Sequence, residues 1–160
     1  MHIKNLEEIF IHLLSGIYSA ENQLIPALAE LARESSNESL STAFRNHLDE
    51  TQVQIERLDQ IIKDVPSIQI KRMKCVAIEG LIEEANEMIE ISEKNEIRDI
   101  AFIAVAQKIE HYEIASYGTL VILAEQLGFK KIVQCLNETL NEEKAMNSKL
   151  TNLAVGIINR

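Results

Sequence analysis

Apolar residues recur three or four positions apart along nearly the whole chain, which is the spacing that predicts amphipathic α-helices. The pattern predicts four long helices, over about 5–35, 38–63, 96–127 and 130–158, and a shorter one over about 73–91. Short connections join the first two long helices and the last two, so each pair is expected to form an antiparallel hairpin. The sequence therefore predicts an all-α four-helix bundle of two antiparallel hairpins, with an extra helix in the crossover between them.

Local signals agree with these boundaries. Asn5 can cap the first helix together with Glu8, three residues later, and Gly128 stands where a helix commonly ends. Pro26 lies inside the first apolar pattern and is expected to kink that helix. Glycine and proline are otherwise sparse and no linker interrupts the chain, so we expect a single domain over 1–160.

The composition excludes several classes of partner. A formal net charge of −9 argues against nucleic acid, which needs a basic surface, and against anionic membranes. No apolar run is long enough to span a bilayer. Cys75 and Cys135 form no CxxC motif and are expected to be reduced thiols, so we expect a cytoplasmic protein.

Glutamates interrupt the apolar pattern of every long helix at a position where leucine is expected. The distances along the chain match: Glu21 and Glu50 lie 15 and 14 residues from the turn near Ser36, and Glu113 and Glu143 each lie 15 residues from Gly128. At 1.5 Å per residue, all four stand about 22 Å from their turns. We therefore expect Glu21 to face Glu50, and Glu113 to face Glu143, in one layer that also holds Glu110.

Such a layer needs neutralisation, because carboxylates close together in a core cannot all be ionised. No lysine or arginine lies on these seam positions, so either the acids share protons or divalent cations bind. A single seam glutamate is more often an edge residue that reaches solvent. Four helices with one at matched height favour a two-metal carboxylate site, which bundle cores are known to build in this way. Tyr18 and Tyr117 flank the layer and are each expected to hydrogen-bond a carboxylate.

Five segments are informative when taken together: Tyr18–Leu24, His47–Asp59, Lys71–Ala85, Lys108–Leu120 and Leu140–Leu150. They resemble the YciF/YciE-like branch of the ferritin-like superfamily, a group of bacterial stress-associated proteins. The resemblance covers essentially the whole chain and implies a ferritin-like bundle, a homodimer and a role in the stress response. An apolar stripe on the crossover helix agrees with a dimer, since exposed apolar patches mark interfaces. The stripe consists of Val76, Leu81, Ile82, Ala85 and Ile89.

The resemblance also implies two divalent metal ions, most simply iron or manganese, held by Glu21, Glu50, Glu110, Glu113 and Glu143. The usual Glu-x-x-His motif is missing, because Val53 and Met146 stand where its histidines should be. Weaker candidate ligands are His47, Gln54 and Asn147, although His47 can equally be a core histidine that hydrogen-bonds a glutamate. The remaining histidines, His2, His12 and His111, are expected to be surface or packing residues.

Two functions of different kind follow. One is a dimetal oxidoreductase that reacts with O2 or peroxide, as a ferroxidase does. The alternative is a non-enzymatic stress or structural protein that binds a redox-inert ion or a protein partner. The retained carboxylates favour the first and the missing histidines favour the second, because imidazole suits iron while an all-oxygen site suits manganese, magnesium or calcium.

Overall fold

The computed structural model describes residues 3–158, and those residues form five α-helices and no strand. His2 lies outside the described residues. Each helix begins and ends within a few residues of its expected boundary, so the all-α prediction is confirmed. The helices are α1 (Leu6–Glu34), α2 (Glu38–Asp64), α3 (Val76–Ile91), α4 (Glu96–Gln126) and α5 (Lys130–Ile158).

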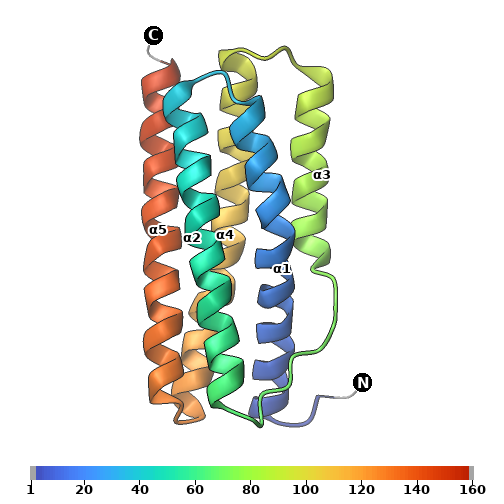
Figure 1. Ribbon diagram of the computed structural model, residues 1–160, viewed down its shortest axis with the longest axis vertical. Coiled ribbons are helices and arrows are strands. Elements are labelled where there is room, and N and C mark those ends of the chain that lie inside the picture. The colour runs from blue at the N-terminus through green and yellow to red at the C-terminus, as the bar shows by residue number, and fades with distance from the viewer. Residues whose placement is uncertain (1–2, 159–160) are drawn as a thin grey trace.

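Four of the helices make the bundle, and the fifth lies outside it (Figure 1). Helices α1 and α2 form one antiparallel hairpin and α4 and α5 the other, and the two hairpins pack through α1 against α4 and α2 against α5. Helix α3 belongs to the crossover and packs on α1 and α4. The ferritin-like four-helix bundle with an extra crossover helix is therefore confirmed.

Capping side chains set the helix ends. The Asn5 side chain accepts a hydrogen bond from the backbone N–H of Glu8, as the sequence predicts, and Asn37 and Asn95 cap α2 and α4 in the same way. Gly128 follows α4 with φ of +76°, a conformation that glycine adopts without a Cβ clash. Pro26 lies inside an unbroken α1.

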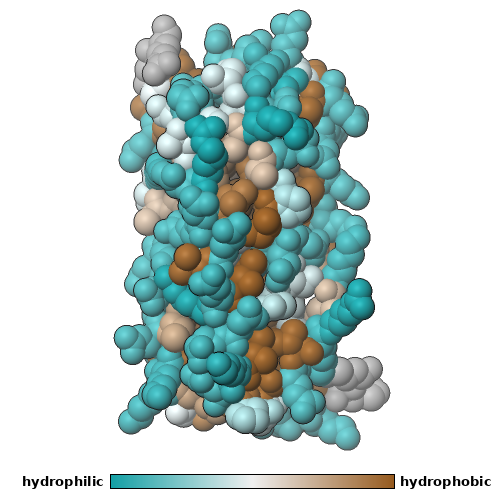
Figure 2. Space-filling view, in the orientation of Figure 1, coloured by the Kyte–Doolittle hydropathy of each residue, from teal (hydrophilic) through white to brown (hydrophobic). Residues whose placement is uncertain are grey.

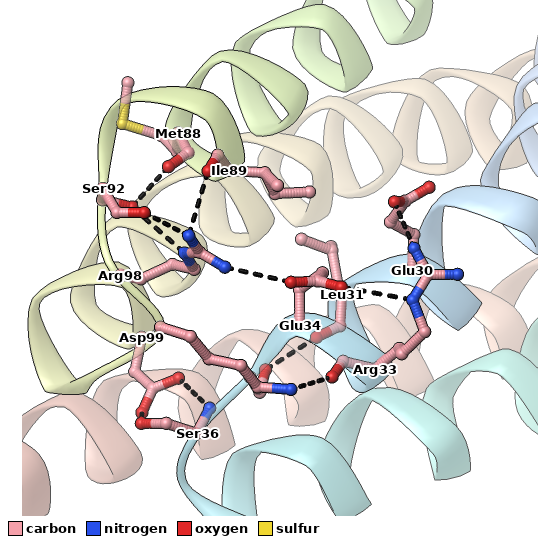
Figure 3. Close-up of polar contacts among 12 residues, drawn as sticks. Glu30, Leu31, Arg33, Glu34, Ser36, Met88, Ile89, Ser92, Arg98 and Asp99 are labelled. Atoms are coloured by element: carbon pink, nitrogen blue, oxygen red, sulfur yellow. Dashed lines mark hydrogen bonds and ion pairs between the residues drawn. The ribbon is translucent and has the colours of Figure 1, made fainter.

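Two buried charged residues at the start of α4 tie three segments together (Figure 3). The carboxylate of Asp99, only 1% exposed, accepts hydrogen bonds from the backbone N–H groups of Ser36 and Asn37 and from the Ser36 hydroxyl, at 2.6–2.9 Å. Arg98 pairs with Glu34 of α1 at 3.0 Å and donates to backbone carbonyls at the end of α3. These contacts fix the α1–α2 turn and the end of α3 against α4.

Most of the crossover helix's apolar stripe is covered by the bundle itself. Ala85 is buried, and Leu81, Ile82 and Ile89 are half-buried against the core, whereas Val76 is 76% exposed. The stripe is thus a weaker basis for a dimer than the sequence suggested, and the homodimer stays a prediction that sedimentation velocity can test.

The face seen in Figure 2 is mostly hydrophilic, with hydrophobic side chains gathered along its middle. This agrees with a chain in which charged residues make up 26% of the sequence. Among residues 3–158, none of the helices combines the length and the apolar character that crossing a bilayer requires.

Candidate metal centre

Four side chains from three helices meet in the middle of the bundle: His47 of α2, Glu110 and Glu113 of α4, and Glu143 of α5. Each offers one nitrogen or oxygen atom, and these four atoms all lie within 4.8 Å of one another. None of the four residues is more than 2% exposed. One imidazole and three carboxylates at this spacing could hold a metal ion.

Helical periodicity directs these side chains inward. Glu110 and Glu113 are three residues apart and therefore share one face of α4, and buried Tyr117 continues that face by another turn. On α2, the buried positions His47, Thr51 and Gln54 follow a four-then-three spacing. The polar residues thus occupy core positions of an otherwise apolar seam.

Glu21 of α1 joins the layer from the same hairpin as His47. It is fully buried, and its Oε1 accepts a short hydrogen bond from the Tyr117 hydroxyl, while its Oε2 has no partner. The expected bond between Tyr117 and a carboxylate is therefore confirmed. Tyr18 also bonds a carboxylate, but that of Asp59, at 2.8 Å and outside the layer.

Glu50 does not lie with the other glutamates. Its side chain is 41% exposed, and its Oε2 lies 3.8 Å from Nδ1 of His47. The expectation that Glu50 faces Glu21 in the buried layer is not met, because Glu50 stands at the edge of the α2 seam. Its role as a metal ligand stays a prediction. Val53, at the position of the missing histidine, is also exposed, at 45%.

The two amide candidates differ in position. Gln54 is fully buried, its Nε2 donates a short hydrogen bond to Glu143 Oε1, and its Oε1 has no partner. Asn147 is half-buried and accepts from Gln107 at 3.3 Å. Gln54 therefore contacts a glutamate of the centre, whereas the Asn147 side chain contacts the amide of Gln107.

Sequence reasoning missed a pair beside the centre, Arg57 and Glu142. Two guanidinium nitrogens of Arg57 each lie 2.6 Å from a carboxylate oxygen of Glu142, which also accepts from Gln54 at 3.0 Å. Although partial burial acts to raise it, the hydrogen bonds from Arg57 hold the pKa of Glu142 below its usual range. In the sequence, Glu142 is one of two adjacent glutamates, and no signal distinguishes it from a solvated surface acid.

Burial dominates the electrostatics of the layer. It raises the pKa of Glu113 and of Glu143 well above the usual glutamate range, and neighbouring glutamates add to the effect. It also raises the pKa of Glu21 to about 7, against the opposing hydrogen bond from Tyr117. Without a cation, these raised pKa values favour the protonated forms of Glu21, Glu113 and Glu143.

His47 is the basic member of the layer. Its Nε2 lies 3.2 Å from Glu110 Oε1 and 4.0 Å from Glu143 Oε2. Burial is the largest single influence and by itself lowers the pKa of His47, but the charge and hydrogen bonding of Glu110, together with Glu50 and Glu143, outweigh it and the pKa is raised. The imidazole thus offers the layer one nitrogen atom, although the Glu-x-x-His motif is missing.

Buried polar atoms that lack hydrogen-bond partners show whether these residues suit a metal ion. Within residues 3–158, nine buried side-chain atoms lack a partner in hydrogen-bond geometry, and all nine belong to the layer or to adjacent positions of α2. Both oxygens of Glu113 and both nitrogens of His47 are among them. Buried polar atoms ordinarily have partners, so their concentration here fits a cation as the absent partner.

Known proteins share this sequence and fold. The chain is 63% identical to protein YciF of Escherichia coli (strain K12) over 160 residues, which is all of this chain and 96% of that protein. The crystal structure of the E. coli stress protein YciF matches with a TM-score of 0.96, covering 99% of each chain. YcfI from Rhodopseudomonas palustris, which is described as a proposed structural protein, is 47% identical, with a TM-score of 0.87 over 93% of this chain and 94% of that one.

A family model described as a domain of unknown function, DUF892, matches residues 5–160. Together with the 63% identity to a full-length relative, this confirms the resemblance to YciF-like proteins that the sequence segments carry. The chain is a member of the DUF892 family.

Proposed function

We propose that this protein binds divalent metal ions at the buried layer and serves the bacterial stress response as a metal-carboxylate protein. The observation that carries the proposal is the convergence of His47, Glu110, Glu113 and Glu143, whose ligand atoms lie within 4.8 Å of one another and largely lack hydrogen-bond partners. Unpaired buried carboxylates are costly, and a bound cation removes that cost.

Iron or manganese is the proposed occupant, because a mixed set of imidazole and carboxylates suits these metals better than magnesium or calcium, which favour oxygen alone. Two ions are proposed, since two divalent charges would offset the four buried glutamates, Glu21 among them. Bound iron or manganese would supply redox reactivity toward O2 or peroxide. The chain's own part is to hold the ligands, to exclude bulk water and to orient Glu21 through the Tyr117 hydroxyl.

Metal analysis tests this proposal directly. Elemental analysis of protein purified without chelator is expected to find iron or manganese, and titration of chelator-treated protein is expected to give a saturating stoichiometry. Glu113→Gln should weaken binding by about a hundredfold or more, since changes even beyond the ligands cost 10- to 100-fold. Glu56→Gln, an exposed glutamate of α2, is the matched control and should leave binding unchanged. Wild-type protein that binds neither metal would refute the proposal.

A second candidate function is a structural stress protein whose acids share protons instead of binding metal. The raised pKa values of Glu21, Glu113 and Glu143 favour it, because they let the metal-free layer exist with neutral carboxyl groups. The description of YcfI as structural points the same way. An oxygen-dependent change in absorption when Fe(II) is added to the metal-free protein would support the redox proposal, and its absence at full metal occupancy would favour a redox-inert role.

A further inference from the structure

We infer that the cleft between α2 and α5 is the route by which a divalent cation enters the buried layer, and that Glu50 receives the cation at its mouth instead of holding it in the centre. This inference rests on the proposed metal-binding function. It explains why Glu50, the expected glutamate ligand that is not buried with the other four, lies next to His47.

A surface cavity of about 300 Å³ opens between the two helices. Its lining includes His47 and Glu50 from α2 and Glu142 and Lys149 from α5, and two small residues, Ala43 and Ala145, leave it room. His47 belongs at once to this cavity and to the four-residue metal group. The cavity therefore reaches the candidate centre through the imidazole.

The imidazole of His47 stands between the two environments. Its Nδ1 is 3.8 Å from the half-exposed Glu50, and its Nε2 is 3.2 Å from the buried Glu110. Neither nitrogen has a partner in hydrogen-bond geometry, although the ring is only 2% exposed. A buried histidine kept for packing would normally hydrogen-bond through at least one nitrogen. In this ring neither nitrogen makes such a bond, although Nε2 is ion-paired with Glu110, and the ring lies between the cavity and the layer.

Charges at the mouth leave Glu50 as the acid that can receive a cation. The carboxylate of Glu142 is held by Arg57 through two contacts of 2.6 Å. Lys149 adds a positive charge at the mouth. Glu50 is 41% exposed, so it can meet a hydrated ion, whereas the members of the buried group are at most 2% exposed. An acid in this place raises the local cation concentration and speeds association.

The experiment measures metal uptake and release separately. Stopped-flow absorption follows Co(II) binding to chelator-treated protein, and excess chelator added to the loaded protein measures release. Glu50→Gln removes the receiving charge, and Ala145→Phe fills the cavity without changing a charged or ligating residue. Glu56→Gln, on the exposed surface of α2, is the control.

The two portal variants, Glu50→Gln and Ala145→Phe, should each take up Co(II) on the order of tenfold more slowly than wild type. The control, Glu56→Gln, should take it up at the wild-type rate. Release should slow by the same factor, since a residue that acts only during passage changes both rates alike. Affinity and stoichiometry at saturation should stay within about twofold of wild type.

Other outcomes overturn the inference in distinguishable ways. Glu50→Gln with weaker affinity, lower stoichiometry and faster release would make Glu50 a resident ligand. Wild-type uptake rates in both portal variants would place the entry route elsewhere. Wild-type protein that binds no Co(II), Fe(II) or Mn(II) would refute the proposed function itself, and the entry route with it.

Discussion

Raising the pH should destabilise the metal-free protein, which is the opposite of the usual behaviour of a protein with salt-bridged carboxylates. The pKa values of Glu21, Glu113, Glu143 and His47 are all raised in the folded state. The folded protein therefore binds more protons than the unfolded chain. The stability that these groups contribute is fully present below their unfolded pKa values and is lost as the pH rises through their folded values.

Glu21 sets the scale of the effect. Its pKa rises from 4.5 in the unfolded chain to about 7 in the folded protein. At 1.36 kcal/mol per pKa unit, this difference corresponds to about 3 kcal/mol, most of it lost between about pH 5 and pH 8. Because Glu21 is fully buried, solvent does not screen this cost. Domains are typically stable by about 5–15 kcal/mol, so Glu21 alone should move the unfolding midpoint visibly.

Urea denaturation in the presence of chelator, at about pH 5 and about pH 8, measures the effect. Wild-type protein should lose at least about 2 kcal/mol over this range from Glu21 alone, and Glu113 and Glu143 should add to it. Glu21→Gln keeps an acceptor for the Tyr117 hydroxyl but cannot titrate, so its stability should fall less steeply. Glu56→Gln should follow wild type.

Metal should reverse the sign of this pH dependence, because ions bind the deprotonated ligands of the folded state and so stabilise it more at higher pH. Metal-free stability that is flat or rises between pH 5 and pH 8 would refute the reasoning. It would mean that the buried glutamates are paired or solvated in a way that the structure does not contain.

Two further predictions concern the scaffold, and urea denaturation measures both. Asp99→Ala should cost about 2–4 kcal/mol, because it leaves two backbone N–H groups of the α1–α2 turn without their acceptor, and Asp99→Asn should cost less. Gly128→Ala should cost about 1 kcal/mol because of its positive φ, whereas Gly118→Ala, inside α4 and with open space around its position, should be neutral or stabilising by up to about 1 kcal/mol.

The sequence was sufficient for the fold because every level of the pattern agreed. Apolar spacing, the caps Asn5 and Gly128, and short hairpin connections all pointed to the same helices. The contacts of Arg98 and Asp99 were not predictable in this way. They depend on which distant turn and helix end come to lie beside α4, and periodicity within one helix carries no information on that.

The sequence predicted where the site residues lie along the bundle axis, but only partly which way each side chain points around its helix. Counting residues from each turn placed Glu21, Glu113 and Glu143 in one layer, and the structure brings these three into the core. The same count for Glu50 gave a height on the α2 axis and not a position around it. At 100° per residue, Glu50 is rotated about 60° from His47 and about 40° from Gln54, which are the buried positions. An apolar stripe more than 100° wide allows such an edge residue to pass for a core one.

This rotation connects the missing motif with the proposed entry route. In a Glu-x-x-His pattern on α2, Glu50 would point inward and the histidine would stand at position 53, but Val53 is exposed. The imidazole comes instead from His47, one turn before Glu50, and occupies the inward position itself. With His47 facing the layer, Glu50 is displaced to the rim, where it can meet solvent while its Oε2 stays 3.8 Å from the ring. Compared with a Glu-x-x-His pattern, the imidazole thus lies on the other side of Glu50, and an accessible carboxylate is left beside the buried centre.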